Sequence, residues 1–136
     1  RQLSASAALQ TAIFDALVAD ASVHGFVADR IYDNVPARSR FPYVSFGPSQ
    51  EIEDDEECID GEEHYFQIDV WDQSQARLAP AKLICGAVKA ALHRAPLTLP
   101  DPYALVFIRV DETRTMLDPD GKTSHGMVMV RAALEI

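Results

Sequence analysis

The stretch from residue 64 to residue 99 joins a strand pattern to a helix pattern, and it constrains the fold more than any other part of the chain. Apolar residues first alternate with mostly polar ones, which predicts a β-strand whose apolar face is formed by Phe66, Ile68 and Val70. Apolar residues then recur at helical spacing, which predicts an amphipathic helix over residues 75–94. Each element has one apolar surface, so the two surfaces can cover each other.

The ends of this helix are marked by residues that suit helix termini. Asp72 and Ser74 have side-chain oxygens that can cap the first turn. His93 and Arg94 fall in the last predicted turn, where positive charge complements the helix dipole, and Pro96 ends the helix. The apolar stripe between these limits consists of Leu78, Ala81, Ile84, Cys85, Val88, Ala91 and Leu92.

Four further segments have regular patterns. They are a helix over residues 3–19 and strands over residues 43–49, 104–115 and 125–136. Ser4 or Ser6 can cap the first helix, and residues 22–25 break the helical pattern after it. Residues 26–32 are interpreted as an irregular connector with a brief extended piece, and residues 34–42 as an ordered loop.

The predicted order of elements is therefore α, β, β, α, β, β. This order predicts a single α+β domain over residues 1–136, in which two hairpins form a four-stranded antiparallel sheet and both helices pack on one face. A chain of 136 residues is long enough for one core. The core positions expected on the last two strands are Val106, Ile108, Val110, Val128, Val130, Ala132, Leu134 and Ile136.

The net charge of −9 comes from one segment. Residues 51–63 contain nine acidic residues and no basic residue, whereas the rest of the chain has twelve of each sign. This distribution argues against a general DNA-binding surface, because phosphate contacts need clustered Lys and Arg. We expect an exposed acidic tip on the first hairpin. Its carboxylates belong to Glu51, Glu53, Asp54, Asp55, Glu56, Glu57, Asp60, Glu62 and Glu63.

No segment has the spacing of a catalytic or metal site. Consecutive carboxylates in the acidic tip point in different directions, and residues 118–121 resemble the start of a calcium loop but lack its later ligands, so a plain turn is favoured there. Ser45, His64 and Asp69 are the residue types of a triad, but no tight elbow holds a nucleophile, and His64 is interpreted as the first residue of a strand. We therefore predict neither enzymatic activity nor a bound cofactor or metal.

Other general features fit an ordinary globular protein. Cys58 and Cys85 have no metal-binding spacing, which favours free thiols over a disulfide, and Cys85 should be a buried small apolar residue. No apolar run approaches the roughly 20 residues that span a bilayer. The first ten residues lack the apolar core of a secretory signal.

Large apolar side chains are expected on the sheet face that the helices leave open. They belong to Tyr65, Trp71, Phe107, Met127 and Met129. One interpretation is a contact surface for other subunits, to which the basic pair Arg38 and Arg40 in the loop could contribute. The alternative is a second small core beneath the loop of residues 34–42.

The chain resembles the tail terminators, also called tail completion proteins, of long-tailed phages and phage-derived gene transfer agents. The resemblance covers nearly the whole chain and rests on short motifs in addition to the central strand–helix unit. These motifs are Leu9, Ile13 and Leu17 in the first helix, Arg30-Ile31-Tyr32-Asp33 followed by Pro36, Phe41-Pro42-Tyr43-Val44, and Asp118-Pro119-Asp120-Gly121 before the last strand.

The resemblance implies a hexameric ring at the end of a tail tube, which stops tube growth and presents a surface to the head connector. The implied partners are other copies of the chain, the tail tube protein and the connector or stopper protein, with DNA passing through the ring without specific binding. The implied location is the head–tail junction of a particle assembled in the host cytoplasm. The alternatives are another head–tail connector or neck protein and, less favoured, a small cytoplasmic enzyme or metal-binding protein.

The acidic tip has no counterpart in the family pattern. In a ring it could line the DNA passage, where carboxylates repel phosphates at close range. It could equally dock on a basic partner ring, or extend into solvent as a charged loop.

Overall fold

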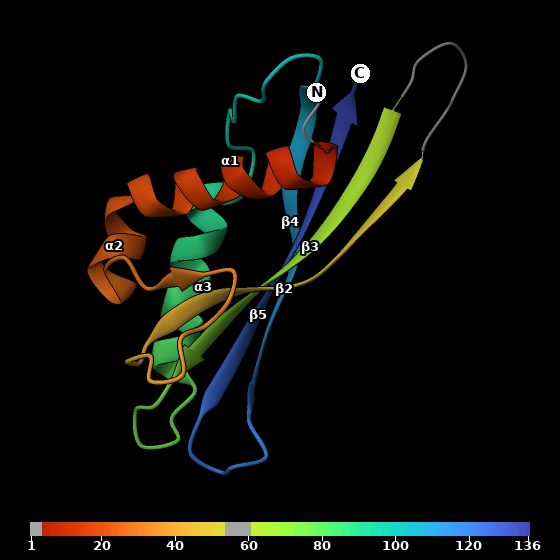
Figure 1. Ribbon diagram of the computed structural model, residues 1–136. Helices are drawn as coiled ribbons and strands as arrows, with labels where there is room; N and C mark the ends of the chain where they lie inside the picture. Colours follow the sequence, from red (N-terminus) through yellow and green to blue (C-terminus); the bar gives the residue numbers. More distant parts are fainter. Residues whose placement is uncertain (1–3, 54–60) are drawn as a thin grey trace.

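Five strands form one twisted sheet in the order β1-β2-β3-β5-β4 (Figure 1). The computed structural model describes residues 4–53 and 61–136. The two predicted hairpins, β2–β3 and β4–β5, are confirmed, and β3 pairs with β5 in antiparallel orientation to join them. The strands are β1 (Ile31–Tyr32), β2 (Tyr43–Glu53), β3 (Gly61–Asp72), β4 (Ala104–Leu117) and β5 (Ser124–Glu135).

The prediction of a four-stranded, purely antiparallel sheet was wrong in one respect. The brief extended piece in the connector is β1, which pairs in parallel with Val44 and Ser45 of β2 and makes the sheet mixed. A two-residue strand is too short to show any alternation in the sequence, so its pairing depends on the tertiary fold.

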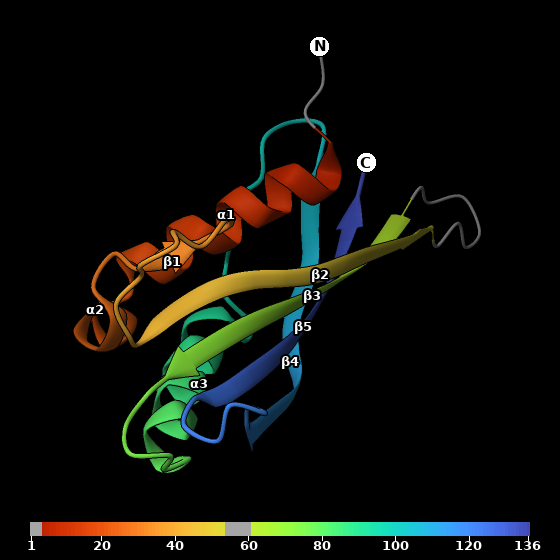
Figure 2. The same ribbon diagram turned by 60° about the horizontal axis from the view of Figure 1, so that its bottom comes forward.

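Three helices lie on one side of the sheet (Figures 1 and 2). They are α1 (Ala5–Ala19), α2 (Ala21–Val27) and α3 (Ala79–Leu92). α3 packs directly on β3, β4 and β5, whereas α1 contacts α2, α3 and β1. No helix in the described part of the chain is long and apolar enough to span a membrane.

The helix at α2 was not predicted, because residues 22–25 were interpreted as a break in the pattern. Asp20 ends α1 and caps α2 at once, since its Oδ2 accepts a hydrogen bond from the Val23 N–H at 3.0 Å. The predicted cap of α1 is confirmed: Ser4 Oγ accepts from the Ala7 N–H at 3.0 Å. A helix with one turn of apolar contacts gives too little periodicity to be recognised.

The predicted limits of α3 were too wide. Neither Asp72 nor Ser74 caps it; the helix begins after Leu78, without a side-chain cap and with Pro80 in its first turn. Its C-terminal cap is His93, so His93 and Arg94 follow the last turn. The Nδ1 of His93 accepts a hydrogen bond from the Val110 N–H at 3.0 Å, which connects the helix end to β4.

The predicted core is confirmed in its main part. The apolar faces of β3 and β5 are buried together with Leu9, Ile13 and Leu17 of α1. Five residues of the predicted α3 stripe are buried with them, whereas Leu78 and Ala91 are half-buried. The prediction of burial is wrong for two residues: Val106 is 55% exposed and Ile136 is 56% exposed. A bulge between Leu105 and Phe107 turns Val106 outward, and Ile136 lies beyond the end of β5.

Cys85 is buried among the core residues, as predicted. Burial, with a smaller contribution from the charge of Asp69, raises the pKa of the Cys85 thiol to about 11. Because the thiolate is the reactive form, we expect Cys85 of a Cys58→Ser variant to resist thiol reagents near neutral pH and to react fully in denaturant. Rapid labelling of the native variant would show that Cys85 is accessible.

Candidate interaction surfaces

The sheet face opposite the helices carries the large apolar residues that the sequence predicted there. Strand alternation places Tyr65 and Trp71 of β3 on this open face, since Phe66, Ile68 and Val70 are buried in the core. The pairing register then adds the β5 and β4 residues of the open face. Tyr65, Trp71, Phe107, Met127 and Met129 all lie on it and are each half-buried.

An aromatic row crosses one end of the open face. The Trp71 ring stacks on His125, with centroids 3.8 Å apart and planes 9° apart, and its other neighbour is Tyr43 at 6.4 Å. Tyr43 in turn contacts Phe41, at 5.3 Å, from the loop before β2. This loop carries Arg38 and Arg40, both of which are exposed. The rings thus connect the loop to the sheet.

A buried carboxylate holds this end of the face in place. Asp69 Oδ1 lies 2.6 Å from His125 Nε2 and accepts a hydrogen bond from Gln67 Nε2 at 2.8 Å. The Trp71 indole N–H donates to Ser45 Oγ at 3.0 Å. The rejected triad of Ser45, His64 and Asp69 is not assembled, because His64 is buried on the opposite face of the sheet. The polar contacts hold the side chains in position and leave no activated nucleophile.

The other end of the open face is dominated by arginine. Phe107 lies beneath two guanidinium groups, with Arg109 Cζ 4.3 Å and Arg131 Cζ 5.3 Å from its ring centroid. Arg131 Nε donates to Asp111 Oδ2 at 3.0 Å, and its Nη1 lies 3.6 Å from Glu63 Oε1. The Asp111 carboxylate raises the pKa of Arg131 above its ordinary value. The positive charge of Arg131 is therefore balanced by carboxylates of the same subunit.

The acidic tip is shorter than predicted. Glu51 and Glu53 belong to β2, and Glu62 and Glu63 belong to β3, where they pair with each other's strands and with β5. Strand pairing overrides charge repulsion here because β5 supplies a hydrogen-bonding partner along the whole of β3. The other predicted tip carboxylates, Asp54, Asp55, Glu56, Glu57 and Asp60, lie outside the described residues.

One group of residues has the donor atoms for a metal ion. Glu51, Glu62 and His64 each place a ligand atom within 4.8 Å of the other two, and one histidine with two carboxylates suits a divalent transition metal. His64 is fully buried inside β3 rather than at its start, and its Nε2 lies 2.9 Å from Glu62 Oε1. This direct hydrogen bond also accounts for the arrangement without a metal.

The turn at residues 118–121 is closed by its own hydrogen bonds. Asp120 Oδ1 accepts from the N–H groups of Lys122 and Thr123 at 2.9 and 2.8 Å, and Oδ2 accepts from the Thr123 hydroxyl at 2.6 Å. The hydrogen bonds from Thr123 and Lys122 lower the pKa of Asp120. The carboxylate that a calcium loop would use is thus engaged within a plain turn, as the sequence indicated.

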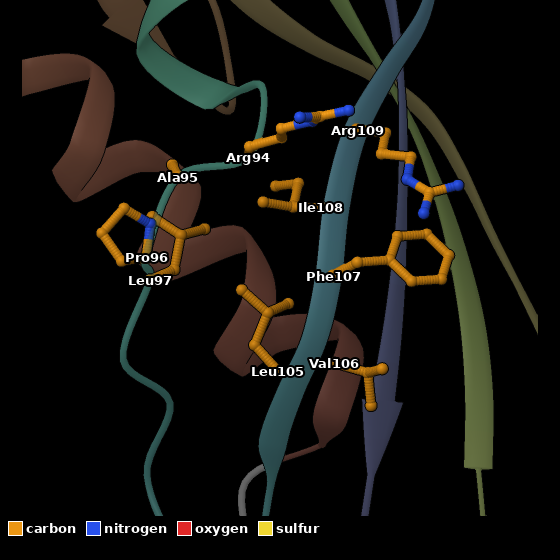
Figure 3. A pocket seen from close by; sticks show the side chains of 9 residues that line it. All are labelled: Arg94, Ala95, Pro96, Leu97, Leu105, Val106, Phe107, Ile108 and Arg109. Carbon is orange, nitrogen blue, oxygen red and sulfur yellow. The ribbon is translucent and has the colours of Figure 1, made fainter.

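A shallow groove of about 500 Å³ follows the outer edge of β4 (Figure 3). Leu105 and Ile108 point toward the segment after α3, whereas Phe107 and Arg109 lie on the other side of the β4 ribbon. Most of the lining residues are apolar types, but polar atoms form the larger part of the exposed lining surface, and the charged residues are Arg94 and Arg109. Among the described residues, no acidic or nucleophilic side chain lines the groove, and the two arginines suit binding of an anionic, partly apolar segment.

Sequence reasoning missed several of these residues. Continuing the alternation from Met129 and Met127 by one more step places His125 on the open face, so its position was available from the pattern. Arg94 and Arg109 come from separate elements, and the hydrogen bond from Arg94 N–H to the Ile108 carbonyl, at 2.9 Å, unites them. That contact has no signal in the sequence.

One family model and two solved structures are similar to this chain. The family model described as tail completion protein gp17 matches residues 11–135. Among solved structures, a chain in the virion of a native gene transfer agent particle is similar over 99% of this chain and 100% of its own, with 29% identity and a TM-score of 0.88. The gp17 protein of bacteriophage SPP1 has the same fold, with a TM-score of 0.61 and 24% identity over 94% of this chain and 89% of its own. No curated protein sequence matches significantly.

Proposed function

Because the chain belongs to the tail completion protein gp17 family, we propose that it forms a ring that caps a tail tube, stops tube growth and joins the tail to the head connector. Family membership confirms the resemblance predicted from the sequence, and it makes the chain a structural virion protein and not an enzyme. We propose that the ring contains six copies and lies at the head–tail junction.

The observation that carries the proposal is the full-length likeness to a chain of the gene transfer agent virion. A subunit that matches over its whole length can occupy the same kind of position in an assembled particle. The proposed partners are further copies of the chain, the tail tube protein on one side and the connector or stopper protein on the other. DNA passes through the ring without specific contacts.

The open face supports a role in assembly. It presents half-buried aromatic and methionine side chains, the residue types that are enriched where protein subunits meet. The aromatic row and the Asp69 hydrogen bonds preorganise these side chains, so little conformational entropy is lost when a partner binds. We propose this face, with Arg38 and Arg40 beside it, as a contact surface for neighbouring proteins.

Deletion of the gene from a producing strain tests the proposal. We expect tails of uncontrolled length and heads without tails, both visible by electron microscopy. Tails of normal length that fail to join heads would instead indicate a connector protein that acts after termination. A reconstruction of the particle neck checks the ring itself, and a single copy there would contradict it.

A charge on the open face should block assembly without unfolding the subunit. Met129 is half-buried there, and its cross-strand neighbours Gln67 and Glu112 can accommodate a lysine. We expect Met129→Lys to keep its melting temperature within a few degrees while particle yield falls sharply. Leu83→Lys, at a residue of α3 that is 63% exposed, is the matched control and should assemble normally. Equal yields from both variants would argue against the open face as an interface.

A further inference from the structure

The groove along β4 has two arginines that form no ion pair with a carboxylate of the described residues. They are Arg94 and Arg109, and both are exposed. Arg109 lies directly across from Arg131 on β5, but the carboxylates beside Arg131 pair with Arg131 and not with Arg109. An external carboxylate at this position would therefore gain favourable contacts that the subunit itself does not supply.

The opposite edge of the sheet presents the complementary pattern. At the end of β2, Ile52 is 46% exposed and stands between the exposed residues Glu51 and Glu53. β1 covers β2 only at Val44 and Ser45, so this end of β2 has no strand beyond it among the described residues.

Alternation along β2 places Ile52 on the open face and Glu51 and Glu53 on the helix side. At the β4 edge, Phe107 and Arg109 lie on the open face, and Arg94 follows α3 on the helix side. An apolar side chain would therefore meet an apolar side chain, and carboxylates would meet an arginine.

The two edges also lie at the same height along the sheet. The register forms continuous rows across the strands from β2 through β3 and β5 to β4, and both edges lie at the end where β4 begins (Figure 1). The rows are Glu53–Glu62–Leu134–Leu105, Ile52–Glu63–Ala133–Phe107 and Glu51–His64–Ala132–Ile108. A rotation about an axis along the strands, with no shift along it, can therefore bring one edge onto the other, and such an operation closes into a ring when its angle divides a full turn.

We propose that the β4 groove of each copy receives the Glu51-Ile52-Glu53 end of β2 from the next copy. Ile52 contacts Val106 and Phe107 on the open face, and Glu51 and Glu53 approach Arg94 on the helix side. The inference rests on the proposed ring and names the surfaces that close it. It gives the Glu51–Glu53 end of β2 a partner within the ring.

Cysteine cross-linking in assembled particles tests this contact. Ile52→Cys and Val106→Cys, combined in a Cys58→Ser background, replace two exposed residues, so the core is unaffected. Within one chain the two positions are separated by β3 and β5, about 14 Å at the usual strand spacing, which is too far for a disulfide. After mild oxidation of purified particles, we expect a ladder of covalent oligomers from the double variant and none from either single variant.

Each other result has a definite meaning. Monomers alone from the double variant, in particles whose neck contains several copies, would overturn the proposed contact and leave the ring standing. A single copy in the neck would overturn the ring as well.

The particle yield of charge-exchange variants tests the proposed pairing independently. Glu53→Arg should lower the yield because the new guanidinium faces Arg94 across the interface, and Arg94→Glu should lower it because the new carboxylate faces Glu51 and Glu53. Combining the two substitutions should restore a substantial part of the yield. Failure of the combination to exceed either parent would contradict the pairing, provided that the melting temperatures of all variants match that of the wild type.

Discussion

Val128→Asp is expected to unfold the protein. Val128 is fully buried at the centre of β5, between Ile68 of β3 and Thr113 of β4. A carboxylate at this position has no partner and costs several kcal/mol, a large share of the roughly 5–15 kcal/mol that stabilises a typical domain. Circular dichroism should show loss of the cooperative thermal transition. Val70→Asp, at a fully buried position on β3, should act in the same way.

Val106→Asp is the matched control for this experiment. Val106 was expected in the core by alternation alone, but the bulge turns it outward to 55% exposure. We therefore expect its stability to change by no more than about 0.5 kcal/mol. A native-like melting temperature for Val128→Asp, or a collapse for Val106→Asp, would show that the facing of the sheet is wrong.

Gly126→Ala is expected to give the next largest loss of stability. Gly126 lies on β5 directly beneath α3, where an added Cβ would overlap Cys85 Sγ and lie 3.3 Å from Val70 Cβ. Overpacking of this kind typically costs about 1–3 kcal/mol, because the surrounding core cannot move apart freely. Chemical denaturation should show the loss as a lower midpoint with an unchanged slope.

A second substitution separates this clash from other effects at the position. Cys85→Ala removes the sulfur atom that the new methyl group meets, so the double variant should be more stable than the sum of the two single changes predicts. Gly86→Ala is the matched glycine control: it lies in α3 with nothing within 4 Å of its added Cβ, and should gain up to about 1 kcal/mol from helix propensity. Strict additivity of Gly126→Ala and Cys85→Ala would mean that the two residues do not clash.

The sequence predicted the parts of the fold that have a long, regular pattern. The stripe of α3 and the alternation of β3 and β5 are strong because each buries one whole face of an element. The two hairpins followed from strand order alone. What escaped prediction depends on tertiary contacts: the two-residue β1, the short helix α2 that Asp20 caps, and the bulge that turns Val106 outward.

The candidate surfaces divide in the same way. Tyr65, Trp71, Phe107, Met127 and Met129 could be placed on one face because alternation fixes which side of a sheet a residue occupies. The stacking of Trp71 on His125 and the basic groove at β4 depend on register and on a loop folding back. Register and loop position depend on contacts between residues far apart in the sequence, which no local pattern encodes.

The uncovered end of β2 bears on how copies of this protein avoid one another before assembly. A strand with a free edge is a template for indiscriminate pairing and aggregation. Here Pro48 removes one backbone donor from that strand, and Glu51 and Glu53 place like charges on any second copy of it. Two β2 edges therefore repel, whereas an edge that carries arginine attracts. Charge therefore opposes pairing between two β2 edges of dissolved subunits and favours their association with an arginine-bearing edge.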